Sequence, residues 1–439
     1  MMKTKSLLLI LLIFPAIQIW SQGLYTLNQA IQQAINSNRN IQLATNAAEI
    51  QANFATWGQA GLLPSLNGSA FVDYGNDQQK FLVTGANEAT SRSGVVGKTY
   101  GASATLNYTI FSGFANLRTY ERLTLNAELA DANSKINIEN IVLQVVSLYY
   151  NVIRTEANLK ATEESLGLSR KRLELEEAKH ELSGGTLLAL LNVQVDLMKD
   201  SVTMVDAKLA KDKARWALNN ALNFPLDSLL NIDEQTNFIN AYEYDELRNQ
   251  MLNQNYELMA MKKEVQVSML DYKIAQSSFS PSLNLSSNYD YTYNEKDYSG
   301  FDYNRSNGFG ATLSLSVPIY NGGRKRTALK NAKIGIENTN LQSEQLQQEL
   351  EMELLSALQG YNIAIDKIKM QEKALEMAKR NFDLTNEKYN MGQIISTQFR
   401  EAQLNLILAK NNLINAKFNA KLAELELLKL SGIILIQNK

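Results

Sequence analysis

Residues Phe309–Gly323 read FGATLSLSVPIYNGG, and this stretch contains both a strand pattern and the turn that ends it. Apolar residues alternate with small or polar ones as far as Ile319, which is the two-residue period of a β-strand. Pro318 and the pair Gly322-Gly323 then interrupt the pattern, and both residue types favour turns. The stretch therefore predicts a strand over about 309–319 with one apolar face and one small, polar face.

A second copy of this pattern lies in the first half of the chain. Tyr100–Gly113 reads YGASATLNYTIFSG and shows the same alternation before a glycine. Pro64-Ser65-Leu66-Asn67 also recurs, 217 positions later, as Pro281-Ser282-Leu283-Asn284. Such self-similarity indicates a duplicated structural unit. We predict two repeats, 22–230 and 231–439, each with a helix, two strands and two long helices. The strands are expected at about 64–75, 99–110, 281–293 and 309–319.

The segments that follow each strand pair have a helical period. Their apolar residues step by three and four positions, as in coiled coils. In the first repeat these residues are Ile138, Ile141, Val145, Leu148 and Val152. No proline interrupts the chain between Gly113 and Leu182, so we expect a helix of about 65 residues, on the order of 100 Å long. The mixed charges of Arg170–Lys179 are expected to form its outward surface.

The composition excludes several classes of protein. The 439 residues include 43 basic and 45 acidic ones, so nothing favours a nucleic-acid partner. The chain has no cysteine and only one histidine, His180, which leaves almost nothing for a zinc site or a hydrolytic triad. We expect no enzyme activity, no metal and no cofactor, and we expect His180 to be a solvated surface residue.

Residues 1–21 have the features of a secretory signal peptide. Lys3 and Lys5 precede the apolar run Leu7–Phe14, and the small residue Ser21 stands before a possible cut at Gln22. An uncleaved membrane anchor is the alternative, but the apolar run is short for a span of about 20 residues. No later segment reaches that length.

The alternating strands are of the kind that crosses a membrane in a β-barrel, where apolar and small, polar residues alternate over about ten positions. Four strands cannot close a barrel, since the smallest have about eight. We therefore expect several copies to share one barrel. An eight-stranded barrel is filled by its own side chains, so a conducting tube favours three copies or more. A soluble sandwich is the alternative. The residues expected to face lipid are Tyr100, Leu106, Tyr108, Phe309, Leu313, Leu315 and Val317.

Two motifs resemble those of a known family. Val317–Arg324 reads VPIYNGGR, which is similar to the strand-exit turn of the TolC-like outer membrane efflux proteins. Tyr389–Gly392 reads YNMG and, with Ser396, resembles the helical turn at that family's periplasmic tip. The resemblance covers essentially all of the chain after residue 21. It implies a mostly α-helical chain that forms a homotrimer, with one twelve-stranded barrel in outer membrane lipid and a helical tunnel in the periplasm of a Gram-negative bacterium.

The resemblance also implies a function and partners. Such a trimer is the passive exit duct of a tripartite efflux or type I secretion system, and a periplasmic adaptor and an inner-membrane pump meet it at the tip. The competing hypothesis is a periplasm-spanning coiled-coil scaffold or adaptor without a pore, which would not need the alternating strands.

The family pattern assigns two groups of residues near the tip. The adaptor-docking turns are Ser183, Gly184, Gly185 and Thr186 in the first repeat and Met391, Gly392, Ile395 and Ser396 in the second. The entrance gate is Tyr389, Gln398 and Glu401. The sequence departs from the pattern because Gln398 stands where an acid is usual and Ile394 stands where an arginine is usual. Only Glu401 keeps its charge, so an acidic ring would be three Glu401 side chains.

Overall fold

The computed structural model describes residues 24–81, 89–182, 184–235, 238, 241–296 and 303–434. The predicted signal peptide, 1–21, lies outside the described residues. The chain divides into two compact units, and each combines segments of both sequence repeats. One unit comprises Met1–Asn36, Val145–Phe238 and Ala378–Ile414, and the other comprises Ser37–Gln144, Ile239–Met377 and Asn415–Lys439. No helix in the described ranges is both long enough and apolar enough to cross a membrane.

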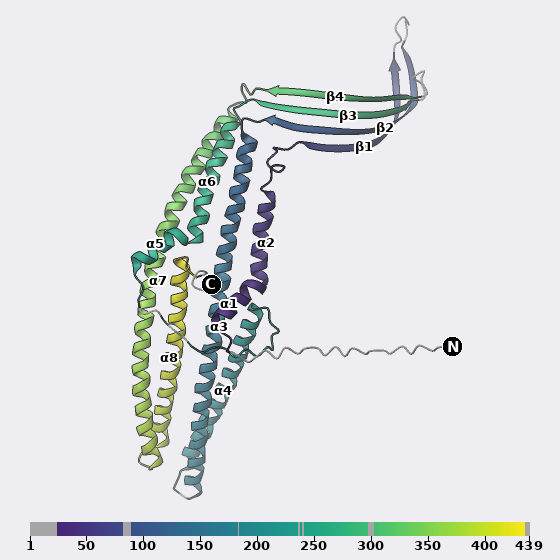
Figure 1. Ribbon diagram of the computed structural model, residues 1–439. Coiled ribbons are helices and arrows are strands. Elements are labelled where there is room, and N and C mark those ends of the chain that lie inside the picture. Colours follow the sequence, from purple (N-terminus) through teal and green to yellow (C-terminus); the bar gives the residue numbers. More distant parts are fainter. Residues whose placement is uncertain are drawn as a thin grey trace, which may run out of the picture. The chain divides into compact units, whose positions relative to one another are not determined.

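The described residues form helices and four strands, and the same order of elements occurs twice (Figure 1). The elements of the first half are α1 (Leu27–Ser37), α2 (Arg39–Phe54), β1 (Ser65–Phe81), β2 (Thr90–Phe111), α3 (Ala115–Glu181) and α4 (Leu187–Ala221). Those of the second half are α5 (Tyr244–Gln254), α6 (Tyr256–Ser277), β3 (Ser282–Lys296), β4 (Asn304–Ser316), α7 (Arg324–Asn390) and α8 (Ser396–Leu430). Both α3 and α7 are 67 residues long, which matches the expectation of very long helices after each strand pair.

The opening helix of each repeat is divided at an asparagine. Asn38 separates α1 from α2, and its side chain accepts a hydrogen bond from the backbone N–H of Asn40 at 2.9 Å. Asn255 separates α5 from α6 in the same way and accepts from Glu257 and Leu258. Asparagine favours such caps because its side chain replaces a missing helical hydrogen bond. The repeat pattern predicts a single opening helix in each repeat, and the asparagine divides it into two.

The four strands form one antiparallel sheet in the order β1-β2-β3-β4, in the second unit (Figure 1). Its register places Leu66 opposite Leu106, Tyr108 opposite Leu285, and Leu285 opposite Leu313. Directly opposed residues share a face, so one face of the sheet carries six of the seven residues predicted to contact lipid. These six are Tyr100, Leu106, Tyr108, Phe309, Leu313 and Leu315. The seventh, Val317, follows the last residue of β4 and is 56% exposed. The strand stops there because Pro318 has no backbone N–H to donate.

The opposite face of the sheet is lined by small and polar side chains that bond across the strands. Ser69 and Ser103 hydroxyls lie 2.8 Å apart, and Thr109 Oγ1 donates to Asn284 Oδ1 at 3.0 Å. Phe71 is the exception on β1, since its ring lies over Gly101 of β2. A β-carbon at that glycine would be only 2.3 Å from the Phe71 ring. The glycine therefore provides the space that the aromatic side chain occupies on this face.

The helices of the second unit pack around an aliphatic core. It joins side chains of α5, α6, α7 and α8, and its buried members are Leu247, Met251, Leu258, Leu350, Leu354, Leu358, Leu427 and Leu430. Asn255 also donates its side-chain amide to the backbone oxygen of Leu430 at 3.1 Å. The asparagine that divides α5 from α6 therefore also fixes the end of α8.

Glu139 on α3 is a buried carboxyl group in this unit. It is 3% exposed, and its Oε1 has no hydrogen-bond partner in the described part of the chain. Burial raises the pKa of Glu139 to about 7; the nearby Glu257 on α6 raises it further, whereas Lys429 on α8 opposes the shift. The folded chain therefore favours the neutral, protonated carboxyl group of Glu139 more than the unfolded chain does.

We expect Glu139 to make stability fall as pH rises from about 4.5 to about 7, because the folded state holds a proton that the unfolded state releases. Below that window the cost is absent, and above it the cost is complete, at most about 3 kcal/mol. Glu139→Gln should therefore raise the thermal midpoint at pH 8 and leave it nearly unchanged at pH 5. Glu121→Gln, at an exposed site on α3, is the matched control. Equal pH profiles for the wild type and Glu139→Gln would contradict the assignment.

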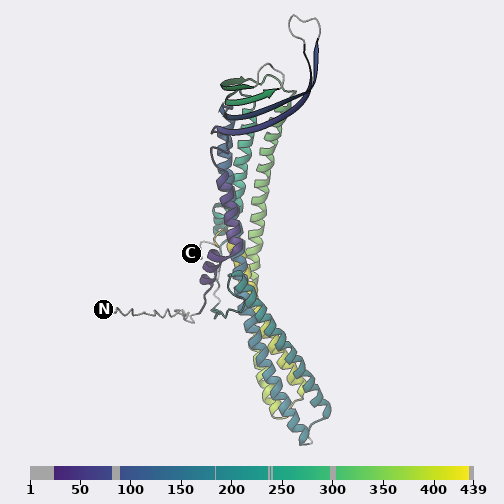
Figure 2. The ribbon, with the colours of Figure 1, turned by 90° about the vertical axis from the view of Figure 1, so that its right-hand side faces the viewer.

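The first unit contains most of α1, the end of α3, all of α4, the end of α7 and the beginning of α8 (Figure 2). Tyr149 on α3, which is 1% exposed, anchors the segment that precedes α1. Its hydroxyl lies 2.8 Å from the backbone oxygen of Tyr25 and 3.1 Å from that of Asp233. Tyr25 also forms a parallel bridge with Ile232. These contacts hold the beginning of the first repeat beside the beginning of the second.

Candidate functional site at the helix tips

The turn between α3 and α4 contains the first group of predicted tip residues. Thr186 caps α4, and its hydroxyl accepts a hydrogen bond from the Ala189 N–H at 3.2 Å. A β-carbon at Gly185 would lie 3.0 Å from the His180 backbone nitrogen, so the close approach of the chain requires a small residue there. Gly184 is exposed and has an ordinary φ, and Ser183 lies outside the described residues.

The turn between α7 and α8 contains the second group. Gly392 has a φ of 71°, a left-handed conformation that favours glycine. Its N–H donates to the Tyr389 backbone oxygen at 3.0 Å. Met391 and Ile395 flank the turn and are 68% and 65% exposed. The tip of this hairpin therefore presents two large apolar side chains, while Ser396 begins α8.

Tyr389 does not stand free at the tip but is buried between the two helical hairpins, α3–α4 and α7–α8. Its hydroxyl donates to Glu176 Oε1 at 2.6 Å, and its ring stacks on Phe399 with centroids 4.7 Å apart. Lys179 also donates to Glu176 at 2.9 Å and lies 4.4 Å from the Tyr389 ring centroid. Burial opposes ionisation of Glu176, but the hydrogen bonds from Tyr389 and Lys179 outweigh it and lower its pKa. Burial and then the Glu176 bond raise the pKa of Tyr389, so the tyrosine stays a donor.

An arginine that the sequence analysis missed ties the two hairpins together. Arg400 on α8 forms two hydrogen bonds with Asp200 on α4, at 2.6 and 2.7 Å. Its Nε lies 3.8 Å from Asp196, which also pairs with Arg172 on α3. The side chains of Arg400 and Asp200 are each 12% exposed. A planar guanidinium matches a carboxylate in this two-bond geometry, which adds directional specificity.

Neutral side chains complete this cluster. Gln403, fully buried on α8, donates to the Ser165 backbone oxygen at 2.9 Å and to Ser169 Oγ at 2.9 Å. Ser169 in turn donates to Asp200 at 2.5 Å. The cluster therefore connects α3, α4 and α8 by bonds that are mostly buried, which makes the alignment of the two hairpins specific.

The expectation that Arg170–Lys179 forms an outward surface is wrong for two of its charges. Arg172 and Glu176 are 3% and 5% exposed. They point to the other helices because each has a partner there, Asp196 and Tyr389 respectively. A signal existed in the sequence, since Arg172 and Glu176 are four residues apart, as are Asp196 and Asp200, and such pairs lie on one helix face.

The other two predicted gate residues do not join the cluster. Glu401 and Gln398 are exposed on α8. Gln398 Oε1 accepts from the Ile395 N–H at 3.4 Å, a local contact at the helix start. Glu401 has no ion pair or hydrogen bond within the described ranges. Ile394, at the position where the family pattern has arginine, is half-buried.

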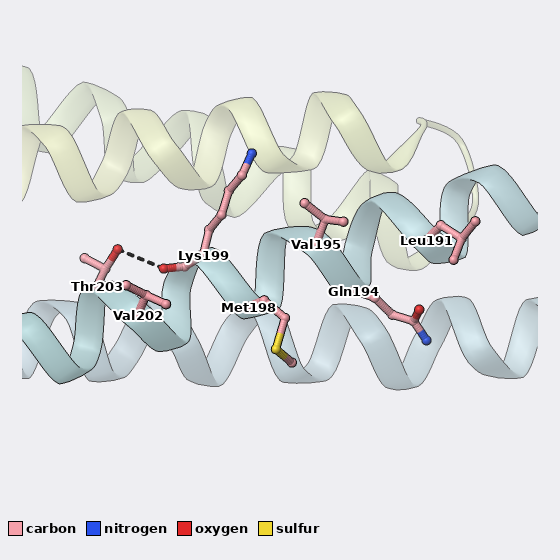
Figure 3. Close-up of a pocket in the computed structure, with 7 residues that line it drawn as sticks. All are labelled: Leu191, Gln194, Val195, Met198, Lys199, Val202 and Thr203. Carbon is pink, nitrogen blue, oxygen red and sulfur yellow. Dashed lines mark hydrogen bonds between the residues drawn. The ribbon is translucent and has the colours of Figure 1, made fainter.

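An apolar stripe runs along the exposed side of α4 (Figure 3). Its residues are spaced alternately by three and four positions and are 46–69% exposed. They are Leu188, Leu191, Val195, Met198, Val202, Val205 and Leu209. Figure 3 shows Leu191, Val195, Met198 and Val202 along the groove. This spacing is that of a coiled-coil seam, so the stripe has the form of a surface that packs on another helix.

A model of the family described as outer membrane efflux protein matches residues 30–223 and 247–433. The chain belongs to the outer membrane efflux protein family. Its match covers both sequence repeats and includes the strands, the long helices and the two tip turns. Like its family, this efflux protein is a channel of the outer membrane that extends into the periplasm. Among the described residues no group of three or more His, Asp or Glu could hold a metal ion.

Individual relatives agree with this assignment. This chain is 22% identical to the outer membrane protein TolC of Vibrio cholerae over 94% of this chain and 91% of that protein. It is also 22% identical to the alkaline protease secretion protein AprF of Pseudomonas aeruginosa, over 88% of this chain and 80% of that protein. The crystal structure of the Campylobacter jejuni CmeC outer membrane channel matches with a TM-score of 0.75 at 17% identity, over 93% of this chain and 86% of that chain. The predicted fold class is thereby confirmed.

Proposed function

We propose that this chain forms a homotrimeric exit duct whose tip docks a periplasmic adaptor and, through it, an inner-membrane pump. The main support for the trimer is the four-stranded sheet with its two open edges. Its four strands leave β1 and β4 each with one unpaired edge, and an unpaired edge in lipid costs several kcal/mol per backbone group. Three copies would join β4 of one to β1 of the next and give twelve strands, enough for a water-filled lumen. The polar face of Ser, Thr and Asn residues would line it.

The α4 stripe supports the same assembly. Seven exposed apolar side chains in a heptad pattern are costly in water, and a helix of a second copy would cover them. The exposed side chains at the turns, such as Met391 and Ile395, support docking of the adaptor at the tips. The proposed docking residues are Ser183, Gly184, Gly185, Thr186, Met391, Gly392, Ile395 and Ser396.

The cargo is proposed to be small molecules expelled by a pump, in line with the family's description. Type I secretion of a protein is a second candidate, which the similarity to the protease secretion protein AprF favours. A scaffold without a pore is disfavoured by the sheet, because a scaffold has no need for a broad apolar face of exposed leucines and aromatic residues.

The test is the mass of the detergent-extracted complex from outer membranes, combined with its conductance in a planar bilayer. We expect about three chains per particle and a channel that is mostly closed without its partners. A monomer or dimer without conductance would overturn the duct. Cross-linking through Ile395→Cys in cells that contain the adaptor then tests the docking tip, with Glu337→Cys, exposed far from the turns on α7, as the control.

Glu401 is proposed to be the charged part of the entrance gate, with Gln398 exposed on the same helix and Tyr389 buried between the hairpins. In a trimer three Glu401 carboxylates would form a ring, and such rings favour cations. Glu401→Gln should reduce cation selectivity and block by multivalent cations while leaving trimer assembly intact. Single-channel recordings check this, and Glu337→Gln removes the same charge from a distant exposed site. Recordings identical to the wild type would remove Glu401 from the gate.

A further inference from the structure

Two rows of large apolar side chains remain exposed on the second unit, one on α2 and one on α7. Steps of four, seven or eleven residues return to nearly the same side of an α-helix, so each set forms one row. Such rows are costly in water and mark surfaces that pack against another element. Their members are 44–65% exposed and are Leu43, Ile50 and Phe54 on α2, and Ile334, Leu341 and Met352 on α7.

The two rows lie on the outer sides of their helices. On α2, Ile50 is nine residues from Ile41, which is 4% exposed. On α7, Leu341 is nine residues from Leu350, which is 3% exposed and belongs to the aliphatic core. Nine residues are about two and a half helical turns, so each row points away from the buried side of its helix. The packing within one chain therefore leaves both rows uncovered.

The helices next to the sheet follow one another in the order of the strands to which they are joined (Figure 1). α2 leads into β1 and α7 follows β4, the two edge strands, while α3 and α6 are joined to the two inner strands. α2 and α7 are therefore the outer helices of this layer. The contacts between successive helices are Trp57, just after α2, with Tyr120 (ring centroids 6.4 Å apart), Arg122 with Asp271 (2.9 Å) and Ser268 with Thr339 (hydroxyls 2.9 Å apart).

We propose that the α2 row of one copy packs on the α7 row of the next copy, and that this helix pair continues the seam between β1 and β4. The inference rests on the trimer proposed above, in which β4 of one copy joins β1 of the next. That junction brings together the two helices that are joined to these strands. Because α2 runs toward the sheet and α7 runs away from it, the two helices are antiparallel.

The spacing of the two rows fits this orientation. Leu43 and Phe54 on α2 are eleven residues apart, about 16 Å along the helix axis. Leu341 and Met352 on α7 have the same separation. An antiparallel alignment places Phe54 opposite Leu341, nearer the sheet, and Leu43 then lies opposite Met352. Apolar side chains therefore meet at both ends of the contact.

The experiment uses the full-length chain, which has no native cysteine. In the alignment above Ala47 of one copy faces Gln348 of the next, and both positions are exposed in the single chain. We expect oxidation of Ala47→Cys/Gln348→Cys in isolated outer membranes to form disulfides between copies, which shift the band on a denaturing gel from one chain to three. A bis-maleimide with a reach of about 10 Å tolerates a shift of one helical turn, about 5.4 Å. Either substitution alone should leave the band at one chain.

Glu49→Cys/Gln348→Cys is the matched control. Glu49 is exposed on α2, and it is two residues from Ala47, about 200° around the helix, so it points away from the row. This variant should remain at one chain. A second test places a charge in the seam: Ile50→Asp should lower the temperature at which the unlinked trimer separates into single chains, whereas Glu49→Asp should not.

The outcomes separate this inference from the proposed duct. If a conducting particle of three chains forms but Ala47→Cys/Gln348→Cys links no better than its control, the helix pairing is overturned and the duct stands. An unchanged separation temperature for Ile50→Asp has the same meaning. A wild type that forms no particle of three chains overturns the duct and the pairing with it.

Discussion

Replacing Leu313 and Leu315 together with arginine should abolish assembly of the protein in the outer membrane. Both side chains lie on the apolar face of β4 and are 61% and 67% exposed in the single chain. Their neighbours across the strand pair are Leu285 and Leu283, so the face is continuous there. An arginine on the lipid side of a barrel costs about 2–4 kcal/mol near the middle of the bilayer. Two such charges together cost about 4–8 kcal/mol, which is comparable with the total stability of a typical domain, about 5–15 kcal/mol.

The control is the same pair of charges on the other face. Thr312 and Ser314 alternate with these leucines and point to the polar side, so Thr312→Arg/Ser314→Arg should still assemble, although its conductance should change. Extraction of outer membranes and analysis of the trimer band without heating measure both variants. Wild-type trimer levels for the leucine double variant would contradict the assignment of this face to lipid.

The regular part of the fold could be predicted because its periods are local. A two-residue period is visible within Phe309–Ser316, and a three-and-four spacing is visible within Ile138–Val152. The pattern also placed six of the seven lipid-facing candidates on one face, because register follows from the side-chain alternation. The seventh, Val317, lies beyond the strand because Pro318 ends the ladder one residue later.

The strand ends were harder to predict. β2 begins at Thr90, whereas the alternation suggested about residue 99, and β4 begins at Asn304 instead of 309. The additional residues are mainly polar or glycine, such as those in Thr90–Lys98. Backbone pairing with the neighbouring strand extends the sheet through such residues, and this pairing leaves no hydrophobic pattern in the sequence.

The site could be predicted only where the signal was local. The tip turns were visible through glycine and through the resemblance to the family. The inter-hairpin cluster could not be predicted, because Arg400 and Asp200 are 200 positions apart. Neither local sequence indicates that the other residue is its partner. Mixed charges on a helix are usually solvated, and Arg172 and Glu176 are buried only because partners reach them from other helices. Two charges four residues apart on a helix indicate that they share one helix face. Which residues they pair with is decided by tertiary packing.

Removing Arg400 should loosen the two hairpins more than any other single change at the tip. Arg400→Met keeps most of the side-chain volume but leaves the carboxylate of Asp200, 12% exposed, without its cation. Breaking one partner of a buried pair costs about 3–5 kcal/mol, because the remaining charge stays buried. Hydrogen exchange of the purified trimer should then show loss of protection at the beginnings of α4 and α8, while the sheet keeps its protection.

A double-mutant cycle separates the pair from a general loss of packing. Arg400→Met combined with Asp200→Leu removes both charges, and apolar replacement of a whole buried pair is often neutral, so protection should largely return. Lys410→Gln breaks the ion pair between Lys410 on α8 and Glu164 on α3. The side chains of Lys410 and Glu164 are 31% and 62% exposed. Exposed pairs contribute about 0–1 kcal/mol, so this control should change little. If Arg400→Met and Lys410→Gln lose equal protection, the buried Arg400–Asp200 pair contributes no more to holding the hairpins together than the exposed Lys410–Glu164 pair. If the double variant remains as loose as Arg400→Met, the cost lies in packing around the arginine stem, and the hairpins are aligned by shape and not by the charge pair.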